Sequence, residues 1–163
     1  MKITEVRLGK LSVPLRVPFK TALRTVNSVE DVIVELRTDT GAVGYGEAPP
    51  TGAVTGDTTG AIIGAIQDHI GKSILGRDVD DFEDLLQTVQ KCVVKNTSAK
   101  AAVDMALWDL YGQLYNIPVY KLMGGARKGI VTDIFPLSDI QHAMDESVRN
   151  KADIVKAVIK IEE

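Results

Sequence analysis

Apolar residues recur at every second position near the start of the chain, which is the spacing of a half-buried β-strand. This spacing predicts three strands, over residues 2–15, 29–38 and 42–48. The second and third are separated by Asp39-Thr40-Gly41, a sequence typical of a tight turn, so we expect them to form an antiparallel hairpin. Pro14 and Pro18 predict that a loop follows the first strand and continues as far as Ser28.

The apolar period changes from two to 3.6 at about residue 58, which predicts helices. Isoleucines four residues apart between 62 and 70 form one stripe, and either Thr55 or Asp57 is a candidate N-cap for that helix. We expect a second helix over residues 80–94 and a third after Ser98. The third helix has a face of small side chains that permits close approach of another element, formed by Ala99, Ala102 and Ala106.

The end of the chain has the pattern strand, helix, strand, in VTDIFPL, SDIQHAMDESVRNKAD and IVKAVIKI. Ser138 is the candidate cap of that helix, and the three segments predict one β-α-β unit. The predicted fold class is therefore α+β: a three-stranded antiparallel sheet followed by a helical bundle, plus a C-terminal β-α-β unit. We place the domains at residues 1–128 and 129–163.

Composition narrows the classes of function. The chain has 163 residues and a net charge of −3, without a block of Lys and Arg and with 5% aromatic residues, which argues against nucleic-acid binding. Cys92 is the single cysteine, so no internal disulfide is expected and a reducing compartment fits. The start MKITEVRL lacks the apolar region of a signal peptide, and no apolar run approaches the ~20 residues of a membrane span. We therefore expect a soluble, cytoplasmic protein.

Few residues are candidates for chemistry. His69 and His142 fall in predicted helices without neighbouring ligand residues, so they are expected to be ordinary surface or interface histidines. Asp104 and Asp109, five residues apart on the third helix, are expected to be polar residues of the helix face or to make structural hydrogen bonds, in preference to forming a catalytic pair. The segment FKTALRT differs, because Arg24 lies there among hydroxyl and aromatic side chains. Arg24 is either a solvated loop arginine or a group that binds a carboxylate through a bidentate pair.

Two runs of sequence identify a resemblance: PFKTALRTVNSVEDVIVELRTDTGAVGYGEAPPTGAVTGD and NTSAKAAVDMALWDLYGQLYNIPVYKLMGG. They resemble the N-terminal capping domain of the enolase superfamily, and within it the dipeptide epimerases that act on L-Ala-D/L-Glu. The resemblance implies a domain that covers a modified (β/α)7β barrel, where Mg2+ and two lysines act on the substrate. It implies that Arg24 binds a substrate carboxylate and that Phe19 and Val54 form walls of the substrate pocket.

The tail departs from this family. In register, Lys160 matches the first lysine of the family's Lys-x-Lys strand, but Glu162 occupies the position of the second, which is the base. Phe135 replaces a residue that usually offers a hydroxyl. The segment FPLSDIQHAMDESVRNKADIVKAVIKI also resembles the closing β-α-β of zinc-dependent medium-chain alcohol and sorbitol dehydrogenases, which has no metal ligand there. The tail is thus either the partial start of a barrel or a foreign end-piece, and Lys160 is either catalytic or an ordinary strand lysine.

The resemblance implies a capping, substrate-specificity domain of a Mg2+-dependent dipeptide epimerase, which is not catalytically competent as this truncated or chimeric chain. No metal or cofactor site is expected within it, although Mg2+ is expected for a full-length family member. The expected partners are a small acidic dipeptide, if a complete site forms, and a second copy or a missing barrel. The alternatives are a non-catalytic binding or oligomerisation module, and one piece of an enzyme that a second polypeptide completes.

Overall fold

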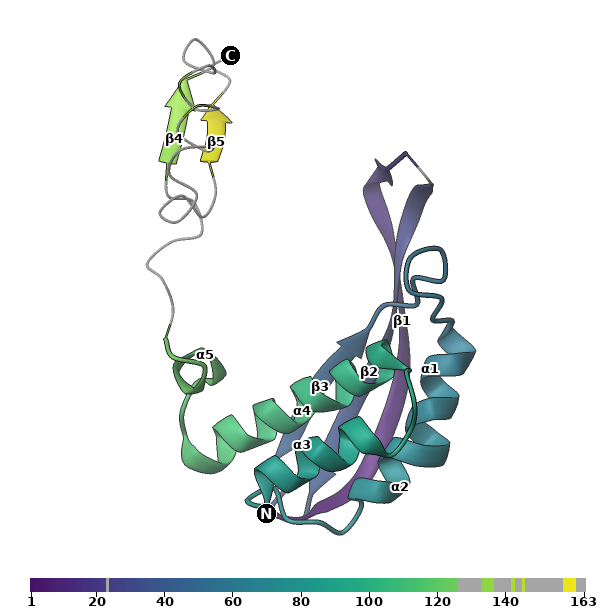
Figure 1. Cartoon of the computed structure of the whole chain (residues 1–163), viewed down its shortest axis with the longest axis vertical. Coiled ribbons are helices and arrows are strands. Elements are labelled where there is room, and N and C mark those ends of the chain that lie inside the picture. Colours follow the sequence, from purple (N-terminus) through teal and green to yellow (C-terminus); the bar gives the residue numbers. More distant parts are fainter. Residues whose placement is uncertain (23, 126–132, 137–141, 143–144, 146–156, 161–163) are drawn as a thin grey trace. The chain divides into compact units, whose positions relative to one another are not determined.

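A computed structural model describes the chain except for residues 23, 126–132, 137–141, 143–144, 146–156 and 161–163. The chain divides into two compact units, Met1–Met123 and Gly124–Glu163, which we describe separately (Figure 1). The predicted domain boundary between residues 128 and 129 lies outside the described residues and stays a prediction.

The first unit is built on a three-stranded antiparallel sheet with the order β1-β2-β3. The strands are β1 (Ile3–Lys20), β2 (Thr25–Thr38) and β3 (Val43–Ala48). Gly41 has a φ of 83° in the turn between β2 and β3, a conformation that glycine adopts without strain. The sheet and its hairpin confirm the prediction made from the period-two pattern.

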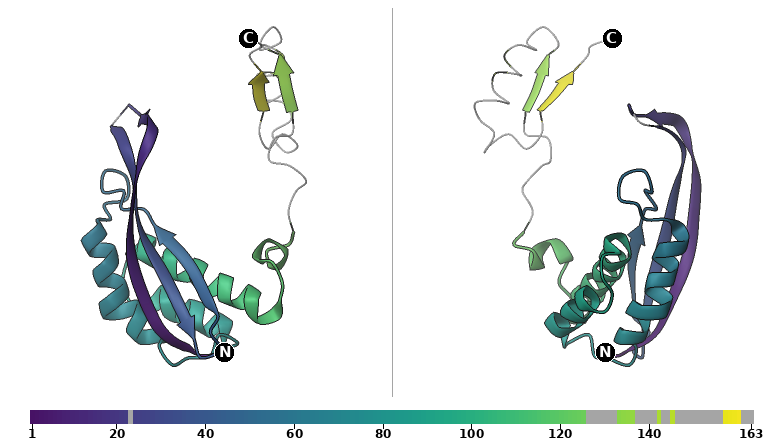
Figure 2. Two further views of the ribbon diagram at one scale, coloured as in Figure 1. Left: turned by 180° about the vertical axis from the view of Figure 1, so that it is seen from behind. Right: turned by 45° about the vertical axis from the view of Figure 1, so that its right-hand side comes forward.

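The loop expected after Pro14 is wrong, because β1 continues through both prolines to Lys20. Beyond the end of β3, β1 and β2 form a two-stranded ribbon that extends past the helices (Figure 2). Strand β1 lies at the edge of the sheet, where a residue without a backbone N–H is tolerated. The pairing of β1 with β2 becomes irregular between Pro14 and Phe19, which absorbs Pro18 as well.

Five helical segments follow the sheet and cover one of its faces (Figures 1 and 2). They are α1 (Thr59–Ala65), η1 (Ile66–Ile70, a π-helical turn), α2 (Gly71–Ile74), α3 (Phe82–Lys91) and α4 (Thr97–Tyr115). A short helix, α5 (Val119–Leu122), comes next. Among the described helices, none combines the length and the apolar character needed to cross a lipid bilayer.

Alternation along β2 determines where the core lies. Val32, Val34 and Leu36 are fully buried under the helices, whereas the residues between them are half-buried on the opposite face. The isoleucine stripe predicted from the sequence is also buried, although it passes from α1 through η1 instead of one regular helix. This core holds the sheet against the helices and leaves the ribbon outside it.

The N-cap of α1 is Thr58, which accepts a hydrogen bond from the Ala61 N–H at 3.3 Å. The predicted caps, Thr55 and Asp57, do not serve in this way. The Asp57 carboxylate instead accepts a hydrogen bond from the hydroxyl of Ser98 in α4. The tertiary contact between Asp57 and Ser98 thus takes the place of the local role as helix cap that an acidic side chain favours.

The backbone of helix α4 lies close to the backbone of β3, because both elements carry small residues where they meet. A Cβ atom built on Gly46 would lie 1.8 Å from the Ala102 carbonyl oxygen, and one on Gly44 would lie 2.2 Å from the Ala106 carbonyl oxygen. The close approach expected of the alanine face is therefore confirmed. The Asp109 carboxylate accepts a hydrogen bond from the Tyr45 N–H at 3.0 Å, which is the structural role expected for it.

The second unit contains a parallel pair of strands, β4 (Asp133–Pro136) and β5 (Ala157–Lys160). Parallel neighbours require a crossover connection, and His142 and Asp145 between them are helical. The strand pairing agrees with the predicted β-α-β unit. Most of the predicted helix, including its cap at residue 138, lies outside the described residues.

Candidate functional site

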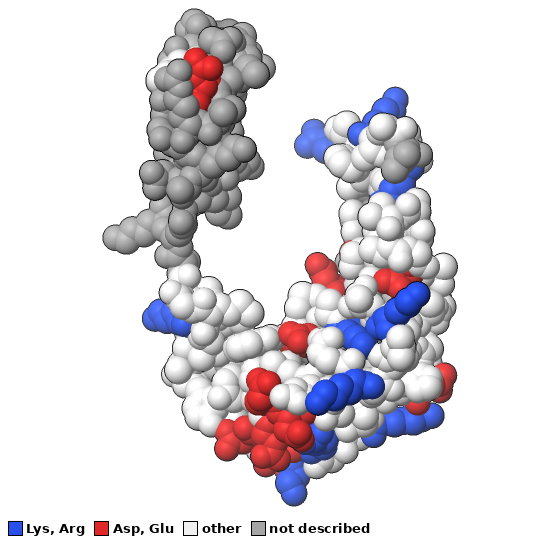
Figure 3. Space-filling model, in the orientation of Figure 1, with Lys and Arg blue, Asp and Glu red and all other residues white. Residues whose placement is uncertain are grey.

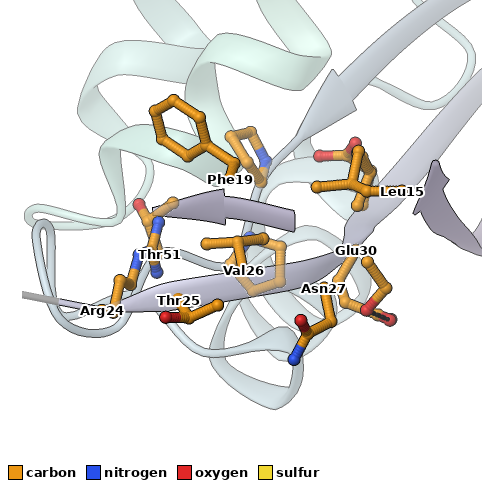
Figure 4. A pocket seen from close by; sticks show the side chains of 13 residues that line it. Leu15, Phe19, Arg24, Thr25, Val26, Asn27, Glu30 and Thr51 are labelled. Atoms are coloured by element: carbon orange, nitrogen blue, oxygen red, sulfur yellow. Dashed lines mark hydrogen bonds between the residues drawn. The ribbon is translucent and has the colours of Figure 1, made fainter. Parts of the chain in front are cut away.

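A hollow of about 660 Å³ lies beside the ribbon of the first unit (Figure 4). It exists because β3 ends at Ala48, so that the part of β2 before Val32 pairs with β1 alone. The segment after β3 turns away and forms the remaining wall. The lining residues come from β1 (Leu15 and Phe19), from residues 24–31 and from residues 49–51.

Arg24 lines this hollow at the far end of the ribbon, and its side chain is exposed. Within the part of the chain that the structure describes, no carboxylate lies at ion-pair distance from its guanidinium. Arg16 and Lys20 are also exposed on the ribbon, and Figure 3 shows basic side chains gathered at its tip. Such a cationic tip attracts anionic ligands to the hollow.

The main chain of Arg24 is held by Thr21 across the end of the ribbon. The Thr21 N–H donates to the Arg24 carbonyl oxygen at 2.8 Å. The Thr21 hydroxyl donates to the same oxygen at 3.2 Å and accepts from the Arg24 N–H at 3.1 Å. Sequence reasoning missed Thr21, although a hydroxyl residue three positions before an arginine in a turn is a recognisable pattern.

Of the two apolar residues assigned to the pocket by resemblance, Phe19 lines the hollow and Val54 does not. Both side chains are largely exposed, at 61% for Phe19 and 72% for Val54. Val54 lies in the segment after β3, where its N–H donates to the Thr51 carbonyl oxygen at 2.8 Å. The structure thus brings Arg24 and Phe19 to one hollow, and the pocket role of all three residues stays a prediction.

The end of the hollow away from Arg24 carries negative charge. Figure 4 shows Glu30 there, apart from Arg24. The hydroxyls of Ser12 and Ser28 donate to the Glu30 carboxylate at 2.6 and 2.9 Å, and these bonds lower the pKa of Glu30. Asp31 also lines the hollow, and burial raises its pKa, helped by the charges of Glu47 and Glu30. Sequence reasoning missed both acids, because whether they line the same hollow as Arg24 depends on where β3 ends.

Lys160 is the last residue of β5 and lies opposite Pro136 of β4 in the strand pairing. Phe135 lies opposite Ile159 in the same pair of strands, and Glu162 lies outside the described residues. No structural observation bears on the chemistry of Lys160, so its catalytic role stays a prediction.

The described residues do not fit a magnesium centre, because no three or more of their His, Cys, Asp and Glu side chains gather into a group that could hold a metal ion. His69 and His142 are both exposed. Burial raises the pKa of Asp104 on α4, and a hydrogen bond with Trp108 opposes that rise. No step of a reaction can therefore be assigned to a metal held by these residues.

Comparison with known proteins places these features in a family. The sequence profile of the mandelate racemase / muconate lactonizing enzyme N-terminal domain matches residues 3–124. An L-Ala-D/L-Glu epimerase of Clostridium acetobutylicum is 53% identical over 156 residues, which cover 96% of this chain and 43% of that protein. The L-Ala-D/L-Glu epimerase of Bacillus subtilis is 45% identical over 133 residues, covering 82% of this chain and 36% of that protein.

Solved structures show the same likeness. A substrate-liganded complex of the Bacillus subtilis L-Ala-D/L-Glu epimerase has a TM-score of 0.78 and 40% identity, covering 98% of this chain and 45% of that one. A dipeptide epimerase of Enterococcus faecalis, complexed with Mg and L-Leu-L-Tyr, has a TM-score of 0.75 and 32% identity, covering 100% of this chain and 46% of that one.

These comparisons also bear on the tail. The match to the Clostridium acetobutylicum protein covers 96% of the chain, so it continues through most of the segment after residue 133. The resemblance of that segment to a dehydrogenase end-piece is not supported by any of these findings. The chain spans less than half the length of the relatives that it matches. It belongs to the mandelate racemase / muconate lactonizing enzyme N-terminal domain family of the enolase superfamily.

Proposed function

We propose that this chain forms the capping, substrate-specificity part of a Mg2+-dependent dipeptide epimerase, whose reaction inverts the α-carbon of the glutamyl residue in L-Ala-D/L-Glu. The names of the two most similar relatives described above support this assignment. The observation that carries it is Arg24: an exposed guanidinium, without an acidic partner among the described residues, at the rim of the hollow.

In this proposal Arg24 binds the side-chain carboxylate of the dipeptide. A planar guanidinium matches a carboxylate through two parallel hydrogen bonds, which a neutral amide side chain does not reproduce. A hydrogen bond to a charged group is worth about 1.5–3 kcal/mol, which corresponds to roughly 10- to 150-fold in affinity. Phe19 and Val54 are proposed to cover the apolar part of the ligand, since both expose apolar surface that water now contacts.

The chemical step is proposed to depend on the barrel portion of such an enzyme. Removing an α-proton beside a carboxylate requires a base and strong stabilisation of the resulting anion, and the described residues of this chain gather no metal-binding group. Lys160, at the end of β5, is the one residue proposed to act in proton transfer. We expect this chain by itself to epimerise no dipeptide.

Calorimetric titration with L-Ala-L-Glu and with L-Ala-L-Gln tests the binding role. The acidic dipeptide is expected to bind more tightly, and Arg24→Ala is expected to remove that preference. Arg16→Ala is the matched control, because Arg16 is an exposed arginine of the same ribbon that does not line the hollow. Retention of the preference in the Arg24 variant would overturn the assignment.

An activity assay on Ala-Glu, with and without Mg2+, tests the proposed need for a barrel. The expected result is no change in optical rotation in either condition, and turnover by the purified chain would refute this part of the proposal. Adding a separately produced barrel portion of an epimerase tests complementation, for which activity in the mixture alone is expected.

The proposal includes a reducing, cytoplasmic location, because the chain carries a single cysteine, Cys92, in the free thiol state. It also includes association with a barrel portion or with a second copy of the chain. Light scattering on the purified protein measures self-association directly, and a monomer at all concentrations would leave the barrel portion as the proposed partner.

A further inference from the structure

Thr21 and Arg24 are joined by three hydrogen bonds, all of which end on the main chain of one residue or the other. The backbone bond closes the end of the ribbon, next to the pair formed by Lys20 and Thr25. The two side-chain bonds use the Thr21 hydroxyl once as a donor and once as an acceptor. This hydroxyl therefore holds both polar groups of the Arg24 main chain.

These bonds matter because no third strand flanks the ribbon end in the part of the chain that the structure describes. It lies beyond the last residue of β3, so β1 and β2 pair only with each other there. Both Thr21 and Arg24 are exposed, and the buried core contains neither. The hydrogen bonds to Thr21 therefore restrain the main chain from which the Arg24 side chain extends.

We propose that Thr21 is a positioning residue that pre-orients Arg24 for a ligand carboxylate. This inference rests on the proposed binding role of Arg24. Holding the Arg24 main chain in one conformation before binding lowers the entropy lost when the guanidinium engages a carboxylate. Substituting Thr21 should therefore weaken the binding of acidic ligands and spare neutral ligands, which do not engage Arg24.

The test compares three variants by calorimetric titration with L-Ala-L-Glu and L-Ala-L-Gln. Thr21→Val keeps the branched shape but removes the two hydrogen bonds between the Thr21 hydroxyl and the Arg24 main chain. It is expected to weaken the binding of the acidic dipeptide by about 3- to 10-fold. Thr21→Ser restores the hydroxyl and is expected to restore the affinity. Thr4→Val is the matched control, because it also removes a hydroxyl that donates to a main-chain carbonyl oxygen, that of Arg37 at 3.2 Å. Neither Thr4 nor Arg37 lines the hollow.

An Arg24→Ala background separates the two proposals. If Arg24→Ala abolishes the preference for the acidic dipeptide and Thr21→Val does not reduce it, the positioning role is wrong while the binding role stands. If Arg24→Ala itself leaves the preference intact, the proposed function fails and this inference fails with it. If both hold, Thr21→Val added to Arg24→Ala produces no further loss.

Hydrogen exchange provides a readout that needs no ligand. The Arg24 amide is expected to exchange faster in Thr21→Val and at the original rate in Thr21→Ser. Thr21→Ala serves as a second variant if the valine disturbs the ribbon. Unchanged exchange in both the valine and alanine variants would overturn the positioning role.

Discussion

The Asp31 carboxyl illustrates how neighbours change the properties of one residue. Burial at the wall of the hollow raises its pKa, and the nearby charges of Glu47 and Glu30 raise it further. Glu30, one position earlier, has its pKa lowered by two serine hydroxyls. The pKa values of two adjacent acids on one strand are thus shifted in opposite directions, because the two carboxyl groups have different neighbours.

A prediction for Asp31 follows from the sign of its shift. Its pKa in the folded chain lies above the usual 3.8, so the folded state holds this proton more tightly than the unfolded state does. The contribution of Asp31 to stability is therefore greatest below pH 3.8, and it declines as the pH rises through the pKa of the folded state. Asp31→Asn is expected to make the chain more stable than the original at pH 7 and equally stable at pH 3, as measured by urea unfolding at both values.

Glu47→Gln is the companion variant, because it removes a repelling charge and keeps Asp31. An NMR titration should then show the Asp31 pKa closer to its usual value. An Asp31 pKa that is unchanged by Glu47→Gln would contradict this account of the shift.

At the scale of elements, α4 and β3 approach each other closely enough that a side chain on the strand glycines would meet the helix backbone. Glycines on the strand meet the backbone of the helix directly, so neither residue can gain a side chain without moving one element. Aromatic contacts secure the same helix toward its other end, where the ring of Phe82 in α3 stacks on Tyr111 with centroids 4.1 Å apart. The position of α4 over the sheet is therefore determined at both ends.

Gly46→Ala is expected to destabilise the fold, because its Cβ would lie 1.8 Å from the Ala102 carbonyl oxygen. Overpacking of this kind typically lowers the free energy of unfolding by about 1–3 kcal/mol. Gly60→Ala in α1 is the matched control, since a Cβ there meets open space, and it is expected to raise stability by up to ~1 kcal/mol. Urea unfolding followed by circular dichroism measures both, and equal effects would contradict the close packing.

At the scale of the whole molecule, the buried apolar residues that the structure describes lie between Ile3 and Leu110, within the first unit. This unit contains its own sheet, its covering helices and the hollow with Arg24. We infer that its folding draws on its own residues, as expected of a domain with a separate core.

Ending the chain after Met123 tests this inference. The shortened chain is expected to unfold cooperatively in urea, with the midpoint of the full chain, and to keep the same affinity for an acidic dipeptide. Loss of the cooperative transition would show that residues after Met123 contribute to the stability of the first unit.

Local patterns were sufficient to predict much of this fold. Alternation predicted β2 and β3, and alanine spacing predicted the close face of α4, because side-chain period and size are properties of adjacent residues. The loop after Pro14 and the cap of α1, expected at Thr55 or Asp57, were predicted wrongly. The first depends on β1 being an edge strand, and the second on a contact between Asp57 and Ser98, which are far apart in sequence.

Three residues were assigned to the substrate pocket by family resemblance, and their binding roles stay predictions. Arg24 and Phe19 line the hollow, and Val54 does not. Thr21, Glu30 and Asp31 were missed. The turn pattern at Thr21 is recognisable in the sequence, whereas the place of Glu30 and Asp31 in the wall depends on where β3 ends. Periodicity says nothing about where one strand stops beside another.

The sequence by itself determined which face of β2 is buried and which alanines of α4 permit close approach, since alternation and side-chain size are encoded position by position. Only the tertiary structure decided that β1 and β2 extend beyond β3 as a ribbon. That difference in strand length leaves one side of β2 without a neighbour, and it sets Arg24 and Asp31 in the same hollow. The physical reason is that strand pairing joins segments that are distant in sequence, so the pattern within one segment cannot reveal where a neighbouring strand ends.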